Sequence, residues 1–209
     1  MAEIKINGKT VVTQTGNAEP LIGGNVLMHN DVLANSTFPA GHVIQVVHVQ
    51  KSSTWSYATG SGSDNYGSIT GLAPTITPLY SNSKILIYVN LYIGTNNYQT
   101  KYRILKNGNS LTNLLGDAEG GRPQSVGTVI NYDNDGTTMR YSLVMMTGIH
   151  QDISSSTNQL TYQIQAASYN GQTVYLNRSH NWQNSPTGGY DAVTSSTVTL
   201  MEIKSWYMI

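Results

Sequence analysis

Residues 84–94, KILIYVNLYIG, form the longest apolar run in the chain, and apolar character alternates along it. β-Branched and aromatic residues dominate and Gly94 ends the run, which favours a strand over a helix. Successive side chains of a strand point to opposite faces. One face is therefore aliphatic, with Ile85, Ile87, Val89, Leu91 and Ile93. The other carries Leu86, Tyr88, Asn90 and Tyr92. The aliphatic face suits a sandwich core, and the second face suits a covering loop or another subunit.

The 209-residue chain has the length of one sizeable domain, or of one domain with an arm. Charged residues make up 11% of it, against about 25% in an ordinary soluble domain. Lys and Arg together number 11, as do Asp and Glu, so the formal net charge is zero. A neutral chain without a basic run has no electrostatic footprint for nucleic acid, and no polybasic or amphipathic segment for a membrane. We expect neither a nucleic-acid partner nor membrane insertion.

The chain contains no cysteine, which excludes disulfides, thiolate metal sites and cysteine nucleophiles. The N-terminal sequence MAEIKINGK lacks the apolar stretch of a signal peptide, so we expect none.

Residues 1–40 differ in character from the rest. EIKING and KTVVTQTG predict two short strands around Asn7-Gly8, a strong hairpin signal. A segment this apolar and too short for its own core usually docks on something. We therefore expect residues 1–40 to be an extended arm that anchors the protein to a partner; the alternative is that it completes its own domain as an edge strand. The expected anchoring side chains are Ile4, Ile6, Val11, Val12, Leu21 and Ile22.

From residue 41 onward the pattern is all-β. About eight to ten antiparallel strands with short-range turn signals predict a sandwich or a jelly roll over residues 41–209. APTITPLYSNS, residues 73–83, is expected to be a connection, because Pro74 and Pro78 are unsuited to a central strand. No convincing amphipathic helix is present. The expected strands lie within residues 42–50, 53–72 (two pieces), 84–94, 98–108, 140–150, 160–169, 173–179 and 196–206.

Metal-binding patterns are incomplete. Asp133 and Asp135 before Gly136 resemble half of a calcium loop, but no glutamate follows at the required distance, and a hairpin turn explains the same residues. The histidines are scattered, at positions 29, 42, 48, 150 and 180. We expect no metal and no cofactor.

Catalytic patterns are also missing. Cleavage of a glycan needs two carboxylates that face each other across the bond. The candidates all lie in apparent loops, and no spacing singles out a pair: Asp117, Glu119, Asp152 and Asp191. The GxSxG pattern is absent as well. We expect no enzymatic activity.

Five aromatic residues lie in or beside Gly/Ser/Asn-rich stretches. Such side chains can stack on sugar rings or anchor a protein partner. The alternative is that they pack over the ends of the sandwich. They are Trp55, Tyr57, Tyr66, Trp182 and Tyr190.

Three phrases together carry a family resemblance: FPAGHVIQVV (38–47), ITPLYSNSKILIYVN (76–90) and STVTLMEI (196–203). Over residues 38–209 the chain resembles a domain of bacteriophage and prophage virion proteins usually labelled tail fibre or structural protein. That domain is similar to the trimeric jelly rolls of the complement and tumour-necrosis-factor type, in which three sandwiches surround a threefold axis. The resemblance implies a homotrimer in a virion, assembled in the host bacterial cytoplasm.

A trimer would bury the second face of residues 84–94, so Tyr88 and Tyr92 are the expected subunit contacts. Forty N-terminal residues leave no room for a long shaft. The sequence therefore favours a short trimeric fibre or a capsid decoration knob, with other virion proteins of the capsid or tail as partners. The alternative function is a tail receptor-binding module that recognises a host surface glycan.

Overall fold

The computed structural model describes residues 2–6, 9–14, 21–22, 40–62, 65–95, 99–130, 143–169, 171–180 and 192–205. The chain divides into two compact units, residues 1–42 and 43–209. This division falls two residues after the boundary expected from the sequence.

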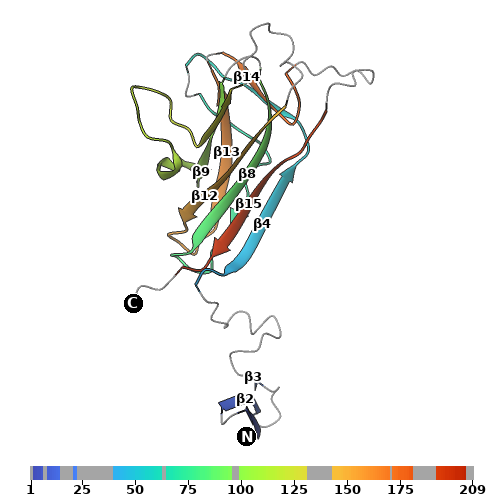
Figure 1. Ribbon diagram of the computed structural model, residues 1–209, viewed down its shortest axis with the longest axis vertical. Helices are drawn as coiled ribbons and strands as arrows, with labels where there is room; N and C mark the ends of the chain where they lie inside the picture. The colour runs from blue at the N-terminus through green and yellow to red at the C-terminus, as the bar shows by residue number, and fades with distance from the viewer. Residues whose placement is uncertain are drawn as a thin grey trace. The chain divides into compact units, whose positions relative to one another are not determined.

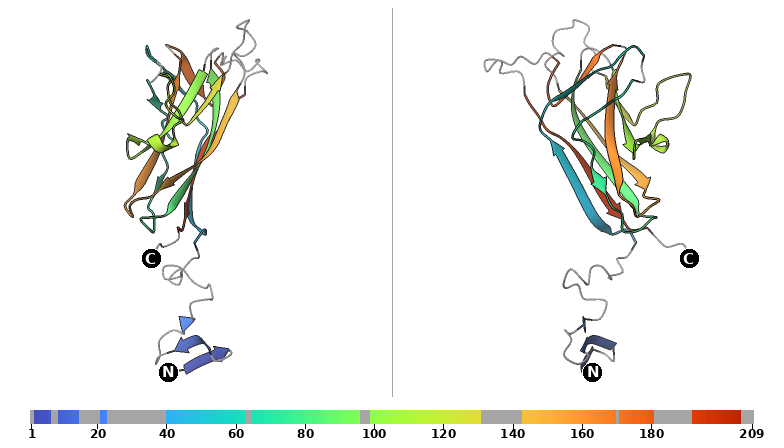
Figure 2. Two further views of the ribbon diagram at one scale, coloured as in Figure 1. Left: turned by 60° about the vertical axis from the view of Figure 1, so that its left-hand side comes forward. Right: turned by 180° about the vertical axis from the view of Figure 1, so that it is seen from behind.

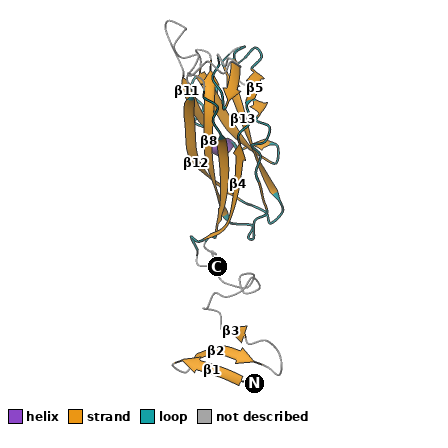
Figure 3. Cartoon of the chain, turned by 90° about the vertical axis from the view of Figure 1, so that its right-hand side faces the viewer, coloured by secondary structure: helices purple, strands orange, loops and turns teal. Residues whose placement is uncertain are grey.

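The first unit contains one antiparallel sheet, in the order β1-β2-β3 (Figure 3). β1 (Ala2–Ile6) and β2 (Lys9–Gln14) are separated by two residues, which confirms the hairpin predicted at Asn7-Gly8. β3 (Leu21–Ile22) adds a strand that the sequence pattern did not indicate. Two residues are too few to display a period of two, so only its partner β2 defines it as a strand.

The second unit is built from strands alone, apart from one 3-10 turn at Thr112–Leu114, among the residues that the structure describes. Its strands are β4 (Val43–Lys51), β5 (Trp55–Ala58), β6 (Gly67–Ser68), β7 (Thr75–Ile76), β8 (Lys84–Thr95), β9 (Gln99–Lys106), β10 (Asn109–Ser110), β11 (Gly127–Ile130), β12 (Val144–Ile153), β13 (Leu160–Ser168), β14 (Thr173–Leu176) and β15 (Ser196–Ile203).

Several of these strands are successive pieces of one longer path. β14 and β15 both pair with the same edge of β8. On their other side, β5 pairs with β14 and β4 pairs with β15. β6 and β7 both pair with β13, while β10 and β11 both pair with β9. Each such pair of pieces can be counted as one strand, and the resulting strands can be numbered in chain order. In this numbering, one sheet has the strand order 1-8-3-6 and the other has the order 2-7-4-5. These two antiparallel sheets form a jelly-roll β-sandwich, which confirms the expected fold class.

Figure 1 shows β4, β15, β8 and β12 side by side, and Figure 2 shows the sandwich from two further sides. The core lies between this sheet and the β9–β13 sheet. The predicted aliphatic face of β8 is buried, and its residues, from Ile85 to Ile93, are at most 1% exposed. It packs in one cluster with Ile104, Tyr162 and Ile164 of the opposite sheet. The alternation of residues 84–94 was therefore interpreted correctly.

β7 lies where the sequence predicted a connection. Thr75 and Ile76 pair with β13 between the two prolines, and the carbonyl of Pro74 accepts a hydrogen bond from the Tyr162 amide at 2.9 Å. β7 is an edge piece, where the missing amide of a proline leaves no gap in the sheet. The argument against a central strand was sound, but it did not exclude an edge.

Asn177 joins the two halves of the divided strands. It is fully buried with φ 62°, a left-handed conformation that asparagine tolerates. Its Nδ2 donates to the carbonyls of Lys51 (2.7 Å) and Ser53 (3.1 Å), and its Oδ1 accepts from Ser196 Oγ at 2.6 Å. One side chain thus links the end of β4, the β4–β5 connection and the start of β15.

Tyr102 crosses from β9 to the opposite sheet, where its hydroxyl lies 2.8 Å from His150 Nε2. A Cβ at Gly127 would lie 2.4 Å from the Tyr102 ring, and one at Gly148 would lie 2.7 Å from its hydroxyl oxygen. These two glycines therefore leave the room that the ring occupies. Burial raises the pKa of Tyr102 to about 12 and lowers the pKa of His150.

Candidate functional site: the outer face of the β4–β15–β8–β12 sheet

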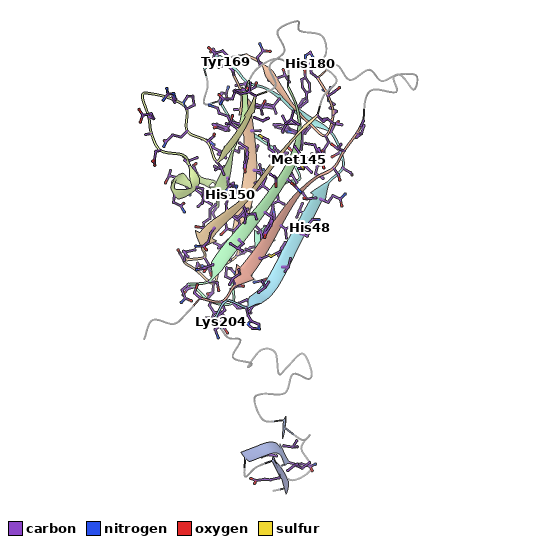
Figure 4. All side chains as sticks on the ribbon, in the orientation of Figure 1. His48, Met145, His150, Tyr169, His180 and Lys204 are labelled. Atoms are coloured by element: carbon purple, nitrogen blue, oxygen red, sulfur yellow. The ribbon has the colours of Figure 1, made fainter. Side chains whose placement is uncertain are left out.

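The outer face consists of the side chains of β4, β15, β8 and β12 that point away from the core. Strand register places them in rows across the sheet: His48, Thr199, Tyr88 and Ile149 form the central row. Large apolar side chains on this face are exposed, among them Ile149 at 58% and Tyr88 at 39%. The exposed apolar set is Val43, Val46, Tyr88, Met145, Ile149 and Ile153 (Met145 is labelled in Figure 4).

The surface at the middle of the outer face is slightly hollowed. The hollow is lined by polar and apolar side chains in adjacent rows: Tyr88, Asn90, Thr147, Thr197, Thr199 and Met201. Thr and Asn side chains beside Tyr and Met give a surface that can bury apolar area while its hydroxyl and amide groups still find hydrogen-bond partners.

The outer face carries almost no charge. Among the described outward-facing residues of its four strands, Lys84 at one end is charged, and His48 is the other group that can become cationic. The carboxylates of these strands, Glu202 and Asp152, are buried on the inner side. A contiguous apolar face without charges typically marks an interaction surface.

The opposite sheet has a different outer face. Arg103 Nε donates to Gln165 Oε1 at 2.8 Å, and Gln165 Nε2 donates to Ser68 Oγ at 2.9 Å. The Arg103 guanidinium also lies 4.2 Å from the centre of the Tyr66 ring. This face is polar, and its side chains already bond one another. The outer face of the β4–β15–β8–β12 sheet is therefore the better candidate for contact with a partner.

Tyr88 and Tyr92, the expected subunit contacts, both lie on the outer face. Tyr88 is in its central row, and Tyr92 is paired with Met145. Sequence reasoning missed their neighbours Val46, Ile149 and Ile153. The signal was available in VMMTGIHQDI of β12, where alternate positions on both faces include apolar residues. A strand with two apolar faces indicates two covered faces.

The aromatic candidates do not form one surface in the described structure. Trp55 packs against the core, and the Tyr57 ring stacks beside it at 6.1 Å and covers Gly67. Tyr66 directly precedes β6 of the other sheet, where its hydroxyl donates to the Gln124 carbonyl at 3.1 Å. These contacts favour the packing alternative for the three. Trp182 and Tyr190 lie outside the described residues.

The anchoring candidates lie in the strands of the first unit. Ile4 in β1 is 60% exposed, and Val12 in β2 is half-buried. The other four lie in β1, β2 and β3, and their side chains fall outside the described part: Ile6, Val11, Leu21 and Ile22.

The buried carboxylates Asp152 and Glu202 of the second unit have partners within the fold. Asp152 was interpreted as a loop residue, but it lies in β12, where its Oδ2 is 2.8 Å from Lys106 Nζ and accepts from the Tyr162 hydroxyl at 2.8 Å. Burial and the nearby Asp152 raise the pKa of Tyr162. Glu202, fully buried, accepts from the amides of Leu79 and Tyr80 and from Ser83 Oγ. These interactions explain both carboxylates structurally.

No group of His, Asp or Glu side chains suited to hold a metal ion occurs within the described ranges. The carboxylates Asp117 and Glu119 are exposed in the connection before β11. Asp133, Asp135 and Asp191 lie outside the described residues. Over the same described ranges, no helix is both long enough and apolar enough to span a membrane.

The fold and this face define a jelly-roll domain with an exposed, nearly uncharged apolar sheet face. No family model and no curated protein matches the chain. Among solved structures, the Gt strain of infectious bursal disease virus aligns with 93% of this chain and 51% of its own, at 10% identity and a TM-score of 0.35. The VP2 subviral particle of that virus aligns over 94% and 47%, at 12% identity and a TM-score of 0.34. This chain spans about half the length of those chains, and TM-scores this low give no information on function.

Proposed function

We propose that this protein is a structural protein of a bacteriophage virion, a short trimeric fibre or capsid decoration knob. In the proposed assembly, three jelly-roll domains pack through their outer faces, and residues 1–40 attach the trimer to the capsid or the tail. The observation that carries the proposal is the outer face, with six large apolar side chains exposed in register across three strands.

The energetics favour burial of this face. Covering a large apolar side chain contributes roughly 1.5–3 kcal/mol relative to leaving it in water. The six side chains are 39–58% exposed, so covering them in a trimer would contribute about half of that value for each one, which opposes an association cost of about 4–15 kcal/mol for each copy that joins. The threefold symmetry is inferred from the sequence resemblance over residues 38–209. Three sandwiches packed around an axis, as in the proteins that the chain resembles, would bury the outer face of the β4–β15–β8–β12 sheet.

The N-terminal sheet is suited to attachment. β1 and β3 are its two edge strands, and an edge offers unpaired amides and carbonyls to a neighbouring strand. Ile4 on β1 adds an exposed apolar side chain. Three copies of such an arm would dissociate slowly, because each bound arm holds the others near their sites.

Removal of the arm tests this function. A fragment of residues 43–209 should remain trimeric but should no longer sediment with virions assembled without this protein, whereas the full chain should. Electron microscopy of the bound particles would show whether the capsid or the tail carries it. Full-length Ile4→Asp serves as a milder variant, which should keep its trimeric mass and lose particle binding. A fragment that still binds would contradict the anchoring role, and an unfolded fragment would assign the arm to the domain itself.

The alternative function, recognition of a host surface glycan, is favoured by one other region. The pairing of Val43 with Ile203 places the start of β4 at one end of the sandwich, and the β8–β9, β13–β14 and β14–β15 connections lie at the other. There Arg178 lies 4.2 Å from the Tyr175 ring centre, His180 packs edge-on against that ring, and Tyr169 is 51% exposed (Figure 4). Aromatic side chains such as these can stack on sugar rings. Binding of the purified trimer to host envelope glycan, weakened by Tyr169→Ala, would support this function.

A further inference from the structure

The outer face contains one group that can change its charge near neutral pH. His48 lies in the central row of the face, opposite Thr199 on β15, and it is labelled in Figure 4. Its neighbours Val47 and Val49 on β4 pack against the core, so His48 points outward. Histidine is the side chain whose ordinary pKa, about 6.5, places its charge change between pH 5 and 8.

Thr199 orients the His48 ring. Nδ1 lies 2.8 Å from Thr199 Oγ1, and a hydroxyl can donate to a neutral nitrogen or accept from a protonated one. This hydrogen bond is therefore compatible with both charge states of the ring. Protonation would give both ring nitrogens an N–H and place a positive charge on this face.

No carboxylate faces His48 from the described strands packed beside it. The outward neighbours are Val46 and Gln50 on β4 and Thr197 and Met201 on β15, none of which titrates. Tyr88 lies one strand further, and Lys84 at the end of the face is cationic. The nearby carboxylate of Glu202 is buried on the inner side, where it is held by Ser83 and two backbone amides. A charged His48 would therefore lack a counterion.

We propose that His48 makes the assembly of this protein acid-sensitive, with second copies of the chain as the occupant of the outer face. This inference rests on the proposed trimer. A second copy suits the face because both surfaces are nearly uncharged and apolar, so they meet without like-charge repulsion. Among the described outward-facing residues of the four strands, Lys84 at the edge is the charged group with which a charged partner could pair.

The direction of the effect follows from linkage. A buried, unpaired imidazolium is unfavourable, so the trimer would bind a proton at His48 less readily than the free chain. At pH 8, above the ordinary histidine range, both states are neutral and assembly has its full strength. As the pH falls, the free chain takes up the proton first and assembly weakens. If the trimer binds no proton at His48, its association constant falls by up to roughly tenfold per chain for each pH unit, or about a thousandfold for three chains.

Sedimentation of the full-length protein at pH 8, 6.5 and 5.5 tests the inference. The wild type should be trimeric at pH 8 and should dissociate at pH 5.5 at micromolar concentration. His48→Gln keeps an uncharged partner for Thr199 and should stay trimeric throughout. His42→Gln removes an exposed histidine just before β4 and should behave as the wild type. Circular dichroism at each pH verifies that the chains remain folded.

The outcomes separate the two proposals. A wild type that is trimeric at every pH, or a His48→Gln variant that dissociates with the wild-type pH dependence, overturns the role of His48 alone. A folded wild type that is monomeric at pH 8 overturns the proposed trimer, and the inference with it.

Discussion

Replacing Ile149 with aspartate is expected to convert the proposed trimer into folded monomers. Ile149 is 58% exposed and lies next to Tyr88 in the central row of the outer face. An aspartate there remains hydrated in a single chain, so the fold should tolerate it. In a trimer the same carboxylate would be buried without a partner, at a cost of several kcal/mol per copy. We expect the concentration needed for assembly to rise at least a thousandfold, measured by sedimentation velocity.

Ile130→Asp is the matched control for this variant. Ile130 is also an exposed isoleucine on a strand, at 64%, but it lies on β11 in the other sheet. It should leave the trimer intact and the melting temperature nearly unchanged. If Ile149→Asp assembled as tightly as Ile130→Asp, the outer face could not be the subunit contact.

Replacing Glu202 with alanine is expected to give the largest loss of stability. Its carboxylate accepts from the amide of Leu79 at 2.9 Å and from Ser83 Oγ at 2.6 Å, and Tyr80 and Gln45 also donate to it. Removal leaves several donors without an acceptor, the Ser83 hydroxyl in a buried position and the Leu79 and Tyr80 amides in partly buried ones, at a cost of up to about 1–3 kcal/mol each. We expect the free energy of unfolding in urea to fall by roughly 3–5 kcal/mol.

Two comparison variants limit the interpretation of the Glu202 result. Glu119→Ala removes an exposed carboxylate from a surface connection and should change stability by no more than about 0.5 kcal/mol. Glu202→Gln keeps the shape but presents an amide nitrogen to groups that also donate, so it should lie between the wild type and alanine. Equal stability of Glu202→Ala and the wild type would show that these hydrogen bonds do not hold the connection before β8.

The strands and the tight turns could be predicted from local patterns in the sequence. The alternation of residues 84–94 identified the central strand and its buried face, because burial on one side needs a period of two. Asn107-Gly108 forms the turn between β9 and β10 with φ of 51° and 84°, as a hairpin turn with two left-handed residues requires. These features depend on neighbouring residues alone, so they can be recognised without a fold.

Features that depend on distant residues could not be predicted in this way. β7 is defined only by its pairing with β13, some 85 positions further along the chain. Ile149 and Val46 belong to one surface because β4 and β12 are the two edge strands of one sheet, and no local pattern specifies this strand order. In the sequence, Glu202 is a charged residue within a predicted strand. Its donors Ser83, Tyr80 and Leu79 are 119 or more positions away, so its role depends on the fold.

The central claim is that the outer face is a contact between copies of this chain, and the mass of the full-length protein in solution tests it most directly. Sedimentation equilibrium at pH 8 and micromolar concentration should give the mass of three chains of 22.7 kDa, about 68 kDa. A stable species of 22.7 kDa under the same conditions would contradict the claim, because the apolar face would then remain open to water.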